Sequence, residues 1–230
     1  MCGRFAFDLS IDMLIELFGL TAQFPVTASF NVAPTQLVAV VRPAPAGGNR
    51  LDLLQWGLIP SWAKDRAIGS RMINARCETA GEKPAFRRLL NARRCVVPAS
   101  GFFEWRSEGK RKMPLYITLR SRAPLLLAGL WDCWRSPEGE LVDSCTIVTT
   151  AANSLLNPVH DRMPVILDPE HARSWLDPQR AEAGFLLDLC RPYPAELMQM
   201  YPVSPLVNSV RNNGADLVRP LDETVPATLF

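Results

Sequence analysis

The chain has 230 residues, six cysteines, two histidines and a formal net charge of +2. A protein of this length buries about 70% of the surface that its unfolded chain exposes, so a core forms without disulfides or metals, and one domain is expected. Hydrophobic residues make up 48% of the chain and charged residues 21%, which excludes a disordered protein. No apolar run approaches the roughly 18 residues of a membrane span, and Asp8, Asp12 and Glu16 interrupt the apolar stretch nearest the N-terminus. We therefore expect a cytoplasmic protein with neither a membrane span nor a secretory signal.

The charge is distributed unevenly along the chain. Residues 61–122 hold fifteen of the 25 basic residues and five of the 23 acidic ones, so this block carries +10, whereas residues 1–60 carry −1 and residues 123–230 carry −7. All but four of the basic residues are arginines, and the planar guanidinium of arginine binds phosphate through two parallel hydrogen bonds. The basic block therefore suggests a polyanionic partner, and a solvated basic surface is the alternative.

In chain order, the first predicted element is a helix that begins after Ser10, a favourable N-cap, and ends at Gly19. The apolar runs Leu37–Val41 and Leu51–Trp56, separated by a loop rich in proline and glycine, predict two strands. The remaining predicted elements are a basic helix over 84–92, strands over 95–97, 102–105, 115–119, 125–131, 145–149 and 164–167, helices over 169–176 and part of 181–189, and a strand over 198–203.

Many short strands, few helices and 20 prolines are typical of an α+β fold. We expect residues 2–210 to form a single domain with a mostly antiparallel, folded-over or barrel-like β-sheet and flanking short helices. Residues 211–230 are expected to form a loosely attached C-terminal tail.

Polar side chains gather in four segments whose local pattern does not require them, namely residues 1–5, 73–79, 98–105 and 159–164. Each segment alone is weak evidence of a functional site. A lone histidine at the entrance of a strand, for example, is more often structural than catalytic. The six cysteines contain no C-x-x-C pair, and three of them lie in apolar runs, where cysteine packs as a small hydrophobic residue. We therefore expect neither a metal site nor a cofactor.

Cys2 has a chemical property that depends on processing. Removal of Met1 would leave a 1,2-aminothiol, with an amine of pKa about 7.7–8.0 beside a thiol of pKa about 8.5. The amine can condense with an aldehyde to an imine, and the thiolate can then close a five-membered thiazolidine ring, because the two groups belong to one residue. An ordinary buried cysteine is the alternative interpretation.

Six motifs follow one another along the chain, namely Cys2-Gly3-Arg4, Asn31-Val32-Ala33-Pro34-Thr35, Trp56-Gly57-Leu58-Ile59-Pro60-Ser61-Trp62, Asn74-Ala75-Arg76-Cys77-Glu78-Thr79, Cys95-Val96-Val97-Pro98-Ala99-Ser100-Gly101-Phe102-Phe103-Glu104-Trp105 and His160-Asp161-Arg162-Met163-Pro164. In identity and order they resemble those of the SOS-response-associated peptidase (SRAP) family, and the resemblance extends from residue 2 to about residue 205. Position 77 is variable within its motif.

The resemblance implies a sensor of abasic sites in single-stranded DNA. The open form of an abasic sugar is an aldehyde, and members of the family form a covalent thiazolidine cross-link with it through the N-terminal cysteine, with associated lyase-type or cross-link-reversal chemistry. The family name records an older proposal of cysteine peptidase activity. We expect a monomer that is associated with the nucleoid when it is bound to DNA.

The resemblance also implies roles for individual residues. Cys2 forms the covalent bond, Glu104 and His160 are the candidate general acid and base that open the sugar, and Asn74 orients the substrate or the amine. Glu104 lies among aromatic residues, where desolvation favours its protonated form. The expected DNA contacts are Arg4, Asn31, Trp62, Arg76, Trp105 and Arg162.

Alternatives remain open at several of these positions. The two tryptophans could belong to the core, and Arg76 could form an internal ion pair with Glu78. For the whole protein, one alternative is an N-terminal-nucleophile hydrolase in which the Cys2 thiolate attacks an amide, and another is a non-catalytic single-strand binding module. The basic block favours a DNA substrate over a small amide. A metal site built from Cys2, His160 and Glu104 is disfavoured, since no pair has a ligand spacing.

Overall fold

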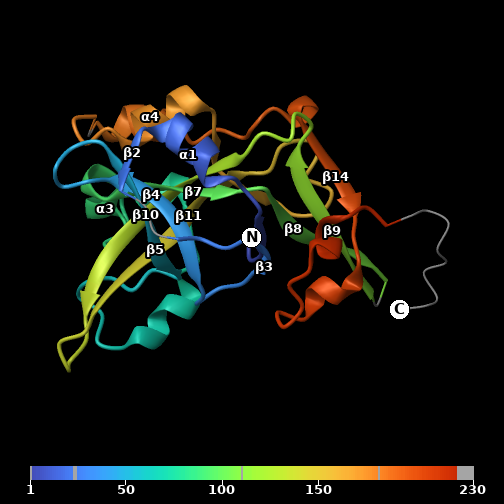
Figure 1. The fold of residues 1–230 in the computed structure, drawn as a ribbon, viewed down its shortest axis with the longest axis horizontal. Coiled ribbons are helices and arrows are strands. Elements are labelled where there is room, and N and C mark those ends of the chain that lie inside the picture. The colour runs from blue at the N-terminus through green and yellow to red at the C-terminus, as the bar shows by residue number, and fades with distance from the viewer. Residues whose placement is uncertain (1, 23–24, 110, 181, 222–230) are drawn as a thin grey trace.

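Two β-sheets dominate the fold, and short helices cover them (Figure 1). The structure is a computed structural model that describes residues 2–22, 25–109, 111–180 and 182–221. The expected α+β architecture, a single domain with a barrel-like sheet and a few short helices, is confirmed.

The larger sheet closes into a five-stranded barrel. Along its path β11, β10, β7, β4 and β5 are neighbours, and β5 then pairs with β11 in parallel at Gln55–Ser144 and Trp56–Cys145, which completes the ring. The strands of this sheet are β2 (Leu20–Ala22), β4 (Leu37–Pro43), β5 (Asn49–Trp56), β6 (Asn74–Arg76), β7 (Arg94–Ala99), β10 (Leu125–Arg135), β11 (Leu141–Ala151), β12 (Arg162–Pro164) and β13 (Ile166–Leu167).

The smaller sheet is antiparallel and follows the order β14-β9-β8-β1-β3. It lies beside the barrel on the right of Figure 1, and the N-terminus lies between the two sheets. Only Ser100 separates β7 of the barrel from β8 of the smaller sheet, so one chain segment joins them directly. The strands are β1 (Phe5–Phe7), β3 (Ser29–Val32), β8 (Gly101–Glu108), β9 (Arg111–Leu119) and β14 (Met198–Pro202).

The helices are short and lie at the periphery. Gly19 ends α1 with a φ of +57°, as the sequence predicts, although the Ser10 side chain makes no capping hydrogen bond. Asp168 caps α4 by accepting a hydrogen bond from the backbone of His171. The helices are α1 (Ile11–Phe18), α2 (Cys77–Ala80), α3 (Arg87–Ala92), α4 (Pro169–Leu176) and α5 (Ala183–Asp188), with 3-10 turns η1 (Arg66–Arg71), η2 (Ala195–Leu197), η3 (Pro205–Asn208) and η4 (Ala215–Val218).

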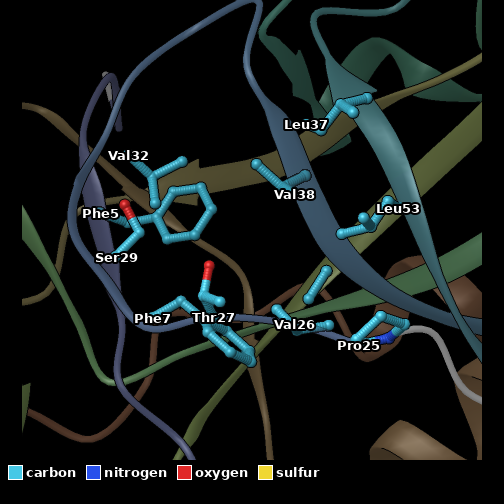
Figure 2. Close-up of a pocket in the computed structure, with 11 residues that line it drawn as sticks. Phe5, Phe7, Pro25, Val26, Thr27, Ser29, Val32, Leu37, Val38 and Leu53 are labelled. Atoms are coloured by element: carbon cyan, nitrogen blue, oxygen red, sulfur yellow. The ribbon is translucent and has the colours of Figure 1, made fainter.

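The main core fills the barrel and continues under β1. The rings of Phe5 and Trp56 join the two sheets, with centroids 5.1 Å apart. Beside them, an apolar cavity of about 180 Å³ lies between β1, β3 and the outer faces of β4 and β5, and Figure 2 shows Phe5, Phe7 and Val38 directed toward it. The N-terminal strand is therefore anchored in the core.

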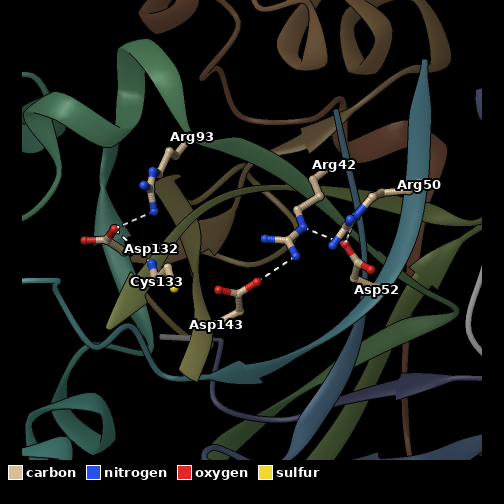
Figure 3. A network of polar contacts seen from close by, with 7 residues as sticks. All are labelled: Arg42, Arg50, Asp52, Arg93, Asp132, Cys133 and Asp143. Atoms are coloured by element: carbon tan, nitrogen blue, oxygen red, sulfur yellow. Dashed lines mark hydrogen bonds and ion pairs between the residues drawn. The ribbon is translucent and has the colours of Figure 1, made fainter. Parts of the chain in front are cut away.

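Several arginines, among them Arg93 and Arg94 of the basic block, are used inside the protein. Arg42 is buried, and its Nε and Nη2 donate to Asp52 and Asp143 at 2.6 and 2.7 Å (Figure 3). The Arg42 and Arg93 guanidinium groups lie 4.1 and 4.7 Å from the ring centroid of Trp131. Arg94 is also buried and donates to backbone carbonyls, including that of Trp175. These arginines stabilise the barrel and are not available to a polyanion.

Residues 211–221, the described part of the segment expected to form a loose tail, contact the rest of the domain. The Asn213 side chain accepts a hydrogen bond from the backbone of Phe30 at 2.7 Å, Leu217 is buried, and the backbone of Leu221 donates to Pro202. The segment stays attached because its polar groups pair with β3 and β14. Residues 222–230 lie outside the described residues.

Candidate functional site

Cys2 lies three positions before the start of β1 and is fully buried. Its carbonyl oxygen accepts a hydrogen bond of 2.9 Å from Nδ2 of Asn74. Burial raises the pKa of the Cys2 thiol, and the nearby negative charge of Glu104 raises it further. The thiol is therefore protonated at neutral pH until a reaction partner or base takes the proton.

Asn74 is held by its strand. It opens β6, which runs parallel to β11 and places Asn74 opposite Ile147 of the barrel. Its Nδ2 is used by Cys2, whereas its buried Oδ1 has no hydrogen-bond partner among the described residues. Burying a carbonyl acceptor without a hydrogen-bond donor costs free energy. This oxygen is therefore suited to accept a hydrogen bond from the substrate, or from the Cys2 amine once that amine is free.

Glu104 and His160 share a cavity. Glu104 is on β8 and only 6% exposed, and burial raises the pKa of its carboxyl group, an effect that the nearby His160 opposes. The Nδ1 atom of His160 lies 2.9 Å from the backbone nitrogen of Arg162 and 2.9 Å from Oδ1 of Asp161, so two contacts hold the ring in place. The two side chains line a cavity of about 450 Å³ together with Trp105, Lys112 and Asn208.

Arg4 and Trp105 form one side of this region. The Arg4 Nη1 donates to Oδ1 of Asn31 at 2.7 Å and to the Val207 carbonyl at 2.9 Å, and the Arg4 guanidinium lies 5.8 Å from the Trp105 ring centroid. Burial lowers the pKa of Arg4. Trp105 donates from its indole nitrogen to Oδ1 of Asn208 at 2.7 Å. Both side chains are half-buried and held by fixed partners.

Asn31 is buried and serves as an anchor. Its Nδ2 lies within hydrogen-bond distance of three carbonyls, those of Val207, Ser209 and Asn212, at 3.2, 3.0 and 2.8 Å. The geometry thus gives Asn31 an internal role, since it fixes the segment that carries Asn208. A direct DNA contact by Asn31 stays a prediction that these bonds disfavour.

Arg162 is also turned inward, with only 9% of the residue exposed. Its two terminal nitrogens bind the carboxylate of Glu78 at 2.6 and 2.8 Å, and Nη2 also donates to the carbonyl of Thr149. The internal ion pair that the sequence suggested for Arg76 is thus made by Arg162 instead. Arg76 itself is exposed at the end of β6.

Trp62 stands apart from the cavity. Its side chain is 60% exposed, so the alternative that it belongs to the core is wrong. The neighbouring Ser61 accepts a hydrogen bond from Arg88 and donates its backbone N–H to Asp132. Trp62 is not among the residues that line the cavity with Glu104.

Two residues of the cavity were not predicted from the sequence. Lys112 belongs to the basic block, but only the β8–β9 register, which pairs Ser107 with Lys112, brings it to this site. Asn208 follows the last quoted motif, and no local pattern distinguishes it. A correct prediction of the β8–β9 pairing could have placed Lys112 at the site. Asn208 could be placed there only from the three-dimensional structure.

Within the described parts of the chain, every helix is too short or too polar to span a lipid bilayer. Nor do three or more histidine, cysteine or acidic side chains come together there in a group that could hold a metal ion.

Comparison with known proteins was made for sequence and for structure. The model of the family described as SOS response associated peptidase (SRAP) matches residues 1–210. The abasic site processing protein YoqW of Bacillus subtilis is 45% identical over 222 residues, which cover 95% of this chain and 99% of that protein. The abasic site processing protein HMCES of Xenopus tropicalis is 36% identical and matches 71% of this chain, which spans about half (55%) of that protein.

The fold is shared with solved structures. A crystal structure of a protein from Bacteroides thetaiotaomicron superposes with a TM-score of 0.76 at 30% identity and covers 84% of this chain and 85% of its own. A crystal structure of a protein from Bordetella bronchiseptica superposes with a TM-score of 0.77 at 28% identity, and the superposition covers 88% of this chain and 100% of that protein's chain. Together with the sequence match over residues 1–210, these similarities show that the chain belongs to the SRAP family.

Proposed function

We propose that this protein recognises abasic sites in single-stranded DNA and captures them as a covalent thiazolidine through Cys2, once Met1 has been removed. One observation carries the proposal: Cys2, Asn74, Glu104 and His160 come from four separate segments and converge on one site. The names of relatives such as YoqW, which is called an abasic site processing protein, support it.

The chemistry proceeds in two steps. The Cys2 amine attacks the aldehyde carbon of the open sugar, and the carbonyl oxygen leaves as water when the imine forms. The sulfur of Cys2 then adds to the imine carbon, the electron pair of the C=N bond moves to nitrogen, and nitrogen takes the proton that the thiol gives up. One water is lost overall, and no redox partner is needed.

Buried polar groups would assist both steps. Glu104 has a raised pKa, so it can hold a proton for the departing oxygen or for sugar opening, and His160 can exchange protons from the same cavity. The buried Oδ1 of Asn74 can accept a hydrogen bond from the Cys2 amine and so orient its lone pair toward the aldehyde.

The DNA contacts are assigned by exposure. Arg76 is exposed next to the site and would bind a phosphate, and the exposed Trp62 would stack on a base at some distance from it. Arg4 and Trp105 would form the wall against which the sugar lies. Asn31 and Arg162 would support this arrangement from within, through the bonds to residues 207–212 and to Glu78. We propose that the protein acts as a cytoplasmic monomer that joins the nucleoid when it binds DNA.

A second function uses the same residue. With its amine as base, the Cys2 thiolate could attack an amide, which is the peptidase reaction that the family name records. The high pKa that burial gives the thiol disfavours this route, because the nucleophile must be a thiolate before the reaction begins. Lyase-type strand cleavage or reversal of the cross-link would follow from the imine stage.

The test uses purified protein whose mass proves that Met1 is absent. It is incubated with a single-stranded oligonucleotide that carries one abasic site, with an undamaged strand and a duplex as controls. A heat-stable shifted band on a denaturing gel, formed only with the abasic strand, is the expected result. A protein that binds the strand and never yields this band would contradict the proposal.

A further inference from the structure

Two cysteines that the proposed function does not use lie against each other, although 113 residues separate them in the sequence. Cys77 begins α2, directly after Arg76, and Cys190 follows the end of α5. The Sγ atom of Cys77 lies 3.8 Å from the carbonyl oxygen of Cys190, and the Sγ atom of Cys190 lies 3.4 Å from the carbonyl oxygen of Leu186, so both thiols donate to the backbone around Cys190. The pair therefore connects the site motif to a distant helix.

The surroundings of the two sulfurs differ from those of the barrel cysteines. Cys77 and Cys190 are each 6% exposed, whereas Cys95 and Cys145 are fully enclosed. The neighbouring Cys190 side chain and the Thr150 hydroxyl lower the pKa of the Cys77 thiol to about 7 although burial opposes this, which favours its thiolate over those of the other cysteines. Burial instead raises the pKa of Cys95 and of Cys145.

We propose that Cys77 and Cys190 are an oxidation site at which a peroxide forms a reversible intramolecular disulfide. The Cys77 thiolate attacks one peroxide oxygen, the O–O bond breaks, and the products are a sulfenic acid and hydroxide. The Cys190 sulfur then attacks the Cys77 sulfur, the S–O bond breaks, and the proton of the Cys190 thiol leaves with the hydroxyl group as water. The dithiol loses two electrons and the peroxide gains them.

The local structure allows the sulfurs to approach. A disulfide needs an S–S distance of about 2.05 Å, so each thiol must turn toward the other from the carbonyl oxygen to which it now donates. Helix α2 is a single turn, and Cys190 lies in an irregular segment, so neither sulfur is held within a long element. A Cβ placed on Gly81 would lie 3.9 Å from the Leu187 side chain, so the end of α2 already packs against α5.

The position of Cys77 connects oxidation to the site, an effect that rests on the proposed function. Its neighbours are Arg76, proposed to bind phosphate, and Glu78, whose carboxylate holds Arg162. A bond to Cys190 would draw this turn toward α5 and displace both side chains. We expect the disulfide to slow the capture of an abasic strand and dithiothreitol to restore the rate.

The test begins with the full chain and hydrogen peroxide, without DNA. Oxidation should lower the intact mass by about 2 Da and raise Tm by several degrees. Trypsin, which does not cleave before proline, should release peptides 77–87 and 181–211 as one species that dithiothreitol separates. In a Cys190→Ser variant the Cys77 sulfenic acid should persist and be labelled by dimedone.

Cys133 provides the matched control, because it is only half-buried and its pKa is raised by burial. A Cys133→Ser variant should form the same linked peptide at the same rate. The proposal is overturned if Cys133 is oxidised before Cys77, if Cys77 goes to a sulfinic acid with Cys190 present, or if the linked peptide is missing. A disulfide that forms while capture of the abasic strand keeps its rate overturns the link to the site. Since the mass measurement involves no DNA, its result is independent of whether the proposed function is correct.

Discussion

At Cys2, the amine and the thiol of one residue meet in a fully buried position, where the amine would start the reaction and the sulfur would finish it. The high pKa of the thiol keeps the sulfur from reacting before an imine is present. Each group therefore has a separate and testable task.

Replacing the sulfur should stop the reaction at its first step. Cys2→Ser keeps the amine and most of the side-chain volume, so we expect it to form an imine that borohydride can trap. In the absence of borohydride, this variant should give no heat-stable adduct. Cys2→Ala should behave in the same way and bind undamaged strands with nearly unchanged affinity, since phosphate contacts lie elsewhere. Denaturing gels with and without borohydride measure both stages. A heat-stable adduct of the alanine variant without borohydride would disprove the thiazolidine.

Glu104 should control both rate and stability through its raised pKa. Glu104→Gln removes the exchangeable proton, so we expect capture to slow by about 10²–10⁴-fold. Between the ordinary carboxyl pKa and the raised one, the folded protein binds more protons than the unfolded chain, so the stability of the wild type falls as pH rises through this range. The Glu104→Gln variant does not lose stability in this way. Urea unfolding at a series of pH values should therefore show that the free energy of unfolding of the variant rises relative to that of the wild type as pH increases. Parallel pH profiles would mean that Glu104 is not perturbed.

At the scale of elements, the turn of α2 and the start of β12 are joined by Arg162 and Glu78. Their bidentate pair holds Arg162 inside while Arg76, two residues before Glu78, stays exposed. Two arginines of neighbouring motifs thus have opposite surroundings, which predicts opposite effects of their removal.

Arg162→Ala should lower the free energy of unfolding by about 1–3 kcal/mol, because it removes charge-assisted hydrogen bonds to Glu78 and one to the Thr149 carbonyl. Arg76→Ala should change stability by no more than about 0.5 kcal/mol. It should instead reduce the slope of log affinity against log salt by about 0.7 for a single-stranded oligonucleotide. Urea unfolding and salt titrations measure the two effects. The interpretation fails if Arg162→Ala changes the salt slope and Arg76→Ala destabilises the fold.

Elements with strong local signals could be predicted from the sequence. Helix α1 ends at Gly19 and α4 begins after Asp168 as expected, because caps and apolar spacing act within a few residues. Strands β1, β3 and β6 were not predicted, since each has three or four residues and is held by partners far away in the chain. The same limit applied to the site: motifs identified Glu104 and His160, but the inward turn of Asn31 and Arg162 depends on contacts across the fold.

At the scale of the whole molecule, the N-terminal end of the described chain lies between the two sheets (Figure 1), and Cys2 is fully buried there. The described residues near the other end lie against β14, where Leu221 bonds to Pro202. The two ends should therefore tolerate additions very differently.

An uncleavable tag on the Cys2 nitrogen should eliminate the cross-link, because an amide nitrogen has its lone pair delocalised into the carbonyl and cannot condense with an aldehyde. A tag after Phe230 should leave the reaction unchanged. Intact mass before and after incubation with an abasic strand compares the two proteins. The same stable adduct on the N-terminally blocked protein would show that Cys2 does not act through its amine.

Strand β1 is hydrogen-bonded to β3 on one side and to β8 on the other, so it cannot be enclosed until β8, much later in the chain, has been made. At a synthesis rate of about 5–20 residues per second, this leaves the first residues accessible for about 5–20 s. After folding, Cys2 is fully buried and its carbonyl is bonded to Asn74. On the proposed mechanism, the removal of Met1 is then confined to the nascent chain, and protein that folds with Met1 in place stays inactive. Protein synthesised with and without methionine aminopeptidase present can be compared by intact mass and by cross-linking to an abasic strand, which measures whether activation is decided during translation.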